Sequence, residues 1–144
     1  MIKAAKNRIG SNSNYTPLLS SKFLDKISGK KIYVKAECLQ KTGSFKFRGG
    51  WSFLSNLTEK ERRSGVLAFS SGNHAQGVSA AAKAFSVPCT IVMPKDAPKI
   101  KIKNTVDYGA QVVLYDRKKD VREDIGYEIA KKNNLKVIHP YEEP

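Results

Sequence analysis

Four short apolar runs alternate with longer stretches of helical length through the second half of the 144-residue chain. The apolar runs are 65–69, 89–93, 111–115 and 136–139 (GVLAF, CTIVM, QVVLY and KVIH). The stretches between them are 73–85, 98–108 and 120–133. Short apolar strands separated by helices are typical of a parallel sheet that is buried on both faces. The sequence therefore predicts an α/β fold, a parallel sheet with helices on both faces and right-handed crossovers.

The first half of the chain carries a weaker pattern. Residues 1–14 are polar, and we expect them to be irregular, with ordered structure beginning at Thr16. Residues 31–37 (KIYVKAE) alternate polar and apolar side chains, which predicts a half-buried strand. Ile32 and Val34 lie on the apolar face of this predicted strand, so that face needs a partner surface.

A loop and two helices are expected before the regular half begins. Residues 40–44 are small or polar and predict a loop, and a helix should follow over 47–57. Thr58 and Glu61 have the spacing of a capping box, which predicts the start of a second, short helix.

Composition limits the function classes. Apolar content of 40% and charged content of 27% are typical of a globular protein rather than a disordered one. No apolar run approaches the roughly 18 residues that span a bilayer, and no apolar stretch follows the basic start, so we expect a cytoplasmic protein with no membrane partner. The net charge of +13 is spread along the chain, with its densest cluster at Lys99, Lys101 and Lys103. We therefore expect no nucleic-acid partner.

The two cysteines, Cys38 and Cys89, fall in different predicted strands. We expect both to be small buried side chains without a disulfide. No CxxC or clustered His/Cys spacing occurs, so the sequence predicts no metal site.

The segment 37–50 (ECLQKTGSFKFRGG) places a lysine directly after a turn. Lys46 follows a Gly-Ser pair at the start of a predicted helix, with Phe45 beside it. A lysine that forms a Schiff base must be partly neutral, and both burial and a positive helix end disfavour its charged form. From these residues alone, an ordinary surface lysine remains an open alternative.

The segment 70–77 (SSGNHAQG) lies between a predicted strand and a predicted helix. In α/β sheets this is where ligands bind, outside the carboxyl ends of the strands. Free N–H groups of the helix start suit a carboxylate, and Ser70, Ser71 and Asn73 add side-chain donors. The alternative is that Asn73 or Ser71 only caps the helix.

Together these two segments resemble the pyridoxal-phosphate-dependent serine/threonine dehydratase family, of fold type II, similar to the tryptophan synthase beta chain. The matching residues of the first segment are Glu37, Thr42, Ser44, Phe45, Lys46, Arg48 and Gly49. The resemblance implies pyridoxal 5'-phosphate as the cofactor, with Lys46 attached to it. It further implies that Phe45 packs near the cofactor ring and that Asn73 hydrogen-bonds the ring hydroxyl.

The resemblance also implies the reaction, a β-elimination on a small amino acid. The loop formed by Ser70, Ser71, Gly72, Asn73 and His74 would bind the substrate carboxylate, with His74 acting mainly through its backbone. Lys46 would remove the α-proton as general base, and the β-hydroxyl would leave to give a 2-keto acid and ammonia.

Three functions remain open at this point. The first is a serine or threonine ammonia-lyase, favoured by Phe47-Arg48 where related sulfur-amino-acid synthases carry Asp-Arg. The second is a serine racemase or hydroxyaspartate dehydratase of the same fold, because a hydroxyl at Ser71 could return a proton from the face opposite Lys46. The third is a non-catalytic remnant or basic binding module.

The resemblance runs from Thr16 to Pro144 but covers only about the first half of a family catalytic unit. The family's glycine-rich phosphate loop is not in this sequence, so we expect a truncated unit with little activity alone. The expected division is residues 1–50 in an incomplete large cofactor-binding domain, 51–140 in a small α/β domain, and 141–144 returning to the large domain. We expect the full-length protein to be a homo-oligomer.

Overall fold

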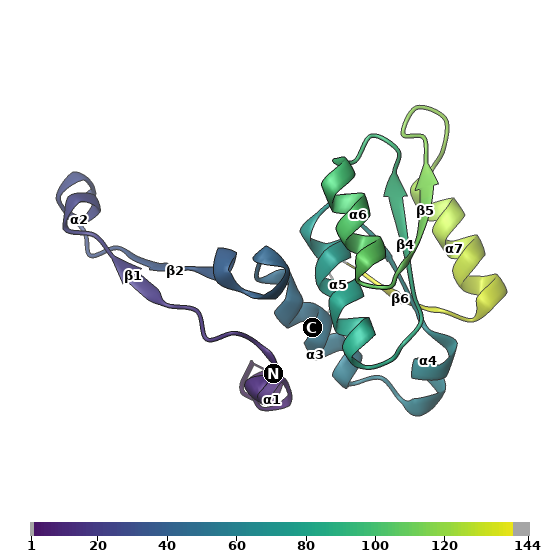
Figure 1. Cartoon of the computed structure of the whole chain (residues 1–144), viewed down its shortest axis with the longest axis horizontal. Helices are drawn as coiled ribbons and strands as arrows, with labels where there is room; N and C mark the ends of the chain where they lie inside the picture. The colour runs from purple at the N-terminus through teal and green to yellow at the C-terminus, as the bar shows by residue number, and fades with distance from the viewer. Residues whose placement is uncertain (1, 140–144) are drawn as a thin grey trace.

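The computed structural model describes residues 2–139, and its second half is a four-stranded sheet (Figure 1). The strands are β3 Val66–Phe69, β4 Cys89–Pro94, β5 Gln111–Tyr115 and β6 Lys136–Ile138. They lie in the order β5-β4-β3-β6, and every neighbouring pair is parallel. The four strands predicted from the apolar runs are confirmed.

Helices cover both faces of this sheet. They are α5 Asn73–Ala84, α6 Lys99–Asp107 and α7 Arg122–Asn133. Alternate residues of β3 point to opposite sides: Val66 and Ala68 pack in the core with α5, whereas Leu67 and Phe69 pack in a second core with α7. The predicted parallel sheet with helices on both faces is therefore confirmed. Within residues 2–139, no helix is long and apolar enough to cross a membrane.

The helix α3 Lys46–Ser55 crosses α5 at very short range. A Cβ built on Gly77 of α5 would lie 2.7 Å from the carbonyl carbon of Lys46, and a Cβ built on Gly50 of α3 would lie 2.9 Å from the carbonyl oxygen of Gly77. Two backbones can approach this closely only where neither helix carries a side chain. The contact fixes the first turn of α3 against α5.

The short helix α4 Glu59–Ser64 joins α3 to β3. Its capping box is complete: the Thr58 hydroxyl accepts a hydrogen bond from the Glu61 backbone N–H, and the Thr58 N–H donates to the Glu61 carboxylate at 2.9 Å. The predicted helix start at Thr58 is confirmed.

The prediction that residues 1–14 are irregular is wrong. Helix α1 Ile2–Ile9 and a 3-10 turn, Gly10–Asn12, occupy this segment. The helix is held by distant groups, because the Arg8 guanidinium donates to hydroxyls on α3 and the Trp51 indole N–H donates to the Arg8 carbonyl at 3.1 Å. Such tertiary contacts override a weak local propensity.

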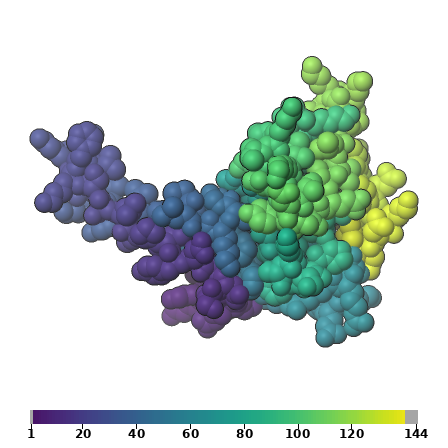
Figure 2. All heavy atoms as spheres, in the orientation of Figure 1, coloured from purple at the N-terminus to yellow at the C-terminus, as the bar shows by residue number. Residues whose placement is uncertain are grey.

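Residues 18–35 form an arm that reaches away from the main body (Figures 1 and 2). In it, β1 Leu18–Ser20 pairs antiparallel with β2 Tyr33–Lys35, and α2 Lys22–Ser28 joins the two strands. The predicted strand 31–37 exists but is shorter. Its half-buried character is wrong for the described chain, because all of β2 is exposed. The arm's exposed apolar side chains are Leu18, Leu19, Phe23, Leu24, Ile27, Tyr33 and Val34.

The two cysteines lie in different environments. Cys89 opens β4 and is buried, as expected. Cys38 lies in a 3-10 turn, Glu37–Leu39, and is exposed, so its predicted place in a buried strand is wrong. Both thiols are free.

The α3–α5 crossing makes a testable prediction. Gly77→Ala should lower the free energy of unfolding by about 1–3 kcal/mol, because the new methyl group must push the Lys46 backbone away. Gly49→Ala is the matched control. It lies in α3, where a new methyl group would meet nothing within 4 Å, and it should raise stability by about 0.5–1 kcal/mol. Urea unfolding followed by circular dichroism measures both, and equal stability of the two variants would contradict the prediction.

Candidate functional site

Residues 70–72 connect β3 to α5 at the point where the sheet changes its winding direction. The chain runs from β3 outward to β4 and β5, then returns to place β6 on the other side of β3. A crevice forms at such a switch point, outside the carboxyl ends of the strands. The asparagine loop, residues 70–74, therefore occupies the position where doubly wound sheets bind ligands.

The start of α5 carries no side-chain cap. Gly72 is the N-cap residue and makes no capping hydrogen bond, and the Ser70 hydroxyl instead accepts from the Gly72 N–H at 3.1 Å. The alternative that Asn73 or Ser71 caps the helix is therefore wrong. An uncapped helix start presents N–H donors and a positive dipole end, which favours an anionic ligand. Ser71 is partly exposed in this loop.

Lys46 is the first residue of α3, and the crossing at Gly77 brings its backbone against α5. Its ammonium lies 5.3 Å from the centroid of the Phe45 ring, which is itself 59% exposed. The structure thus brings the lysine segment, residues 37–50, close to the asparagine loop, although 19 residues separate the two in the sequence.

The His74 side chain makes its own contact in the structure. Its imidazole hydrogen-bonds to the backbone of Ile138 at the end of β6, and its Nε2 is buried with no hydrogen-bond partner. Burial lowers the pKa of His74 to about 4, and the nearby positive charge of Lys46 acts in the same direction. The ring is therefore neutral at pH 7 and ties the asparagine loop to β6.

Asn73 is exposed, and its side chain reaches α6. Its Oδ1 accepts a hydrogen bond from the Lys101 ammonium. One turn further on, the Asn104 amide donates to the Gln76 Oε1 at 3.0 Å. The sequence marked Lys101 only as one of several surface cations. Its contact depends on how α6 lies against α5, which spacing alone does not predict.

A bidentate ion pair joins the two ends of the lysine segment. The Arg48 guanidinium donates to both carboxylate oxygens of Glu37 at 2.8 Å. The Thr16 hydroxyl donates to the same carboxylate at 2.6 Å. The Arg48 hydrogen bonds hold the pKa of Glu37 down at about 2. The pair anchors the base of the arm to α3.

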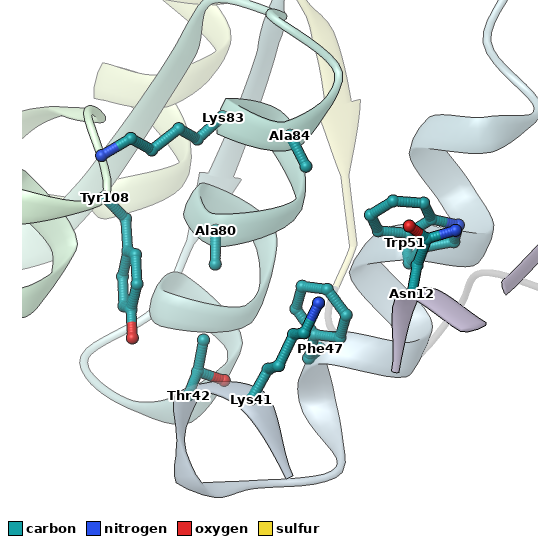
Figure 3. A pocket seen from close by; sticks show the side chains of 9 residues that line it. All are labelled: Asn12, Lys41, Thr42, Phe47, Trp51, Ala80, Lys83, Ala84 and Tyr108. Carbon is teal, nitrogen blue, oxygen red and sulfur yellow. The ribbon is translucent and has the colours of Figure 1, made fainter. Parts of the chain in front are cut away.

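A separate hollow of about 590 Å³ is lined by residues of α3, α5 and neighbouring loops (Figure 3). It is lined by Asn12, Lys41, Thr42, Phe47, Trp51, Ala80, Lys83, Ala84 and Tyr108. Neither the asparagine-loop residues nor Lys46 line it. Among the described residues, no group of three His, Cys, Asp or Glu side chains could hold a metal ion.

Known proteins match this chain over nearly its whole length. The family model described as "Pyridoxal-phosphate dependent enzyme" matches residues 11–144. An L-threo-3-hydroxyaspartate ammonia-lyase of Pseudomonas sp is 48% identical over 144 residues, 100% of this chain and 45% of that protein. An L-threonine ammonia-lyase of Thermotoga maritima is 43% identical over 99% of this chain and 36% of its own length.

A solved structure shows the same fold. Serine racemase from Dictyostelium discoideum superposes with a TM-score of 0.92 at 39% identity, covering 99% of this chain and 46% of that one. The chain therefore spans less than half the length of the relatives it matches.

The Glu37–Arg48 pair predicts a pH dependence of stability. The carboxyl titrates near 4.5 when unfolded and near 2 when folded, so its contribution is complete above pH 4.5 and is lost as the pH falls through 2. Glu37→Gln should remove roughly 1–3 kcal/mol at pH 7 and flatten the decline in the free energy of unfolding between pH 4.5 and 2. Glu128→Gln, at an exposed glutamate of α7, is the control. If the free energy of unfolding fell with pH in the same way for wild type and Glu37→Gln, Glu37 would not be the group with the lowered pKa.

Proposed function

Because the chain belongs to the family of pyridoxal-phosphate dependent enzymes, we propose that it supplies the lysine segment and asparagine loop of an amino-acid ammonia-lyase. The observation that carries this proposal is the close crossing of α3 and α5, which sets Lys46 beside the uncapped start of α5. The names of the relatives, hydroxyaspartate and threonine ammonia-lyases, support elimination on a small hydroxy amino acid.

The residues at this place fit the family's cofactor. The uncapped N–H groups of α5 suit an anionic group. The buried Nε2 of His74, near Lys46, is the acceptor nitrogen of the neutral ring and could accept a hydrogen bond from a donor at this site. Lys46 would hold pyridoxal phosphate covalently, Phe45 would pack near its ring, and Asn73 would hydrogen-bond its ring oxygen. When bound, the cofactor supplies an electron sink that acidifies the α-hydrogen of an amino acid.

Residues of this chain would then bind the substrate and accept its α-proton. The N–H groups at the start of α5 would bind and orient the substrate carboxylate. The Lys46 amine would accept the α-proton, and it must be neutral to do so. The neutral His74 ring adds no positive charge that would compete for the carboxylate. Loss of the β-hydroxyl would lead to a 2-keto acid and ammonia.

A second candidate, amino-acid racemisation, rests on Ser71. A hydroxyl in the asparagine loop, on the face opposite Lys46, could return a proton to the α-carbon. The resemblance to Dictyostelium serine racemase supports keeping this activity beside elimination.

The activity would belong to a longer unit than these 144 residues. The chain covers 45% of the Pseudomonas ammonia-lyase, and the exposed apolar side chains of the arm are the surface that the remaining part would cover. In this proposal residues 1–50 contribute to a large domain and 51–140 form a small one, a boundary that falls inside α3. Residues 141–144 lie outside the described range. The complete unit is proposed to be a homo-oligomer acting on a small amino acid.

Attachment of the cofactor is the direct test. On incubation with pyridoxal phosphate, borohydride reduction and peptide mapping, Lys46 should be labelled at the lowest cofactor concentration of any lysine, because the start of α5 favours the bound anion nearby. Lys46→Ala should abolish this first label.

Lys41→Ala is the control, because this lysine lies in the same segment and faces the Phe47 ring instead. It should keep the label on Lys46. Equal labelling of all lysines, or a first label at another lysine, would contradict the proposed role of Lys46.

Ser71 can be tested in a chimera that joins this chain to the remaining part of the Dictyostelium racemase. Ser71→Ala should lower racemisation of L-serine by about tenfold or more while keto-acid formation persists, because only racemisation needs a proton from the second face. Chiral chromatography and a keto-acid assay measure the two. Ser70→Ala, which removes a loop hydrogen bond, should depress both activities together. Unchanged racemisation in Ser71→Ala would exclude the hydroxyl.

A further inference from the structure

Two hydrogen bonds form a ladder between α5 and α6. Lys101 donates to Asn73, and Asn104 donates to Gln76. The partners are three residues apart on each helix, so the ladder follows one face of α5 and one face of α6. Within α6, the buried Thr105 hydroxyl donates to the Lys101 carbonyl at 2.7 Å. The ladder fixes the rotation of α6 against the first turn of α5.

The hydrogen bond from Lys101 determines how the Asn73 side-chain amide is oriented. An ammonium group can only donate hydrogen bonds, so it must face the carbonyl oxygen of the amide and not its NH2 group. With Oδ1 held by Lys101, the Nδ2 donor is left for a different partner. A free asparagine at a helix start could present either end to a ligand, and this one presents its donor.

We propose that Lys101 is a positioning residue that turns Asn73 into a dedicated hydrogen-bond donor toward an anionic ligand oxygen, the ring oxygen of pyridoxal phosphate. The inference rests on the proposed function and adds to it a residue on α6 that lies 28 positions from Asn73. The cation also adds positive charge close to the accepting oxygen, which stabilises that oxygen in its ionised form.

Neighbouring lysines of α6 do not share this arrangement. Lys103 pairs with Asp107 on its own helix and is 69% exposed, so its charge is paired within α6. Lys103 therefore gives a matched control of equal charge on the same helix.

The experiment uses Lys101→Met, Lys101→Arg and Lys103→Met in the full chain. In ¹H–¹⁵N spectra without ligand, the Asn73 side-chain amide signals should move toward those of a free asparagine in Lys101→Met and stay in place in Lys103→Met. With pyridoxal phosphate, Lys101→Met should bind about tenfold more weakly at Lys46 and shift its absorbance toward the form with a protonated ring oxygen. Lys101→Arg should restore both readouts, which excludes simple misfolding.

Unmoved Asn73 signals in Lys101→Met would overturn the inference. So would moved signals with unchanged affinity and absorbance, because Lys101 would then have no effect on the ligand. If wild type takes no label at Lys46, the proposed function fails, and the proposal that Lys101 sets a cofactor contact is overturned with it. A label at Lys46 with unmoved signals overturns the role of Lys101 alone.

Discussion

The backbone contact between α3 and α5 is the constraint on which the candidate site depends. Gly50 and Gly77 let the two helices meet with no side chain between them, and Gly77 lies directly against the backbone of Lys46. Any larger residue at Gly77 would separate the lysine from the asparagine loop. The distance between Lys46 and the start of α5 is therefore small because neither Gly50 nor Gly77 carries a Cβ atom.

The electrostatics of this meeting point would favour an anion. The uncapped start of α5 and the Lys101 ammonium bring positive potential to one place, while burial keeps His74 neutral. The excess of basic residues over the whole chain acts in the same direction, but it is spread too widely to define a site. Local geometry, more than net charge, sets where an anionic ligand would bind.

The sequence predicted those parts whose signal is local. Apolar strands separated by helices indicated the sheet, and the Thr58 capping box indicated the start of α4. Helix α1 was missed because its stability comes from α3 through Arg8 and Trp51. Lys101 was missed for a similar reason, since its link to Asn73 depends on how two helices pack. The roles of Lys46 and Asn73 came from resemblance, and no spacing rule would have supplied them.

The arm and the α/β unit differ in how completely they are stabilised. The contacts that hold the candidate site, at Gly77, Glu37 and Arg48, all lie within the chain, so the loops keep their arrangement over residues 37–77. The arm has backbone pairing between β1 and β2 but little apolar burial, and a two-stranded pair is marginally stable in water. Since hydrophobic stabilisation scales with buried area, a surface placed over the arm would stabilise the segment that leads directly into Glu37. The Glu37–Arg48 pair joins that segment to α3, so a surface over the arm would also support the helix that begins at Lys46.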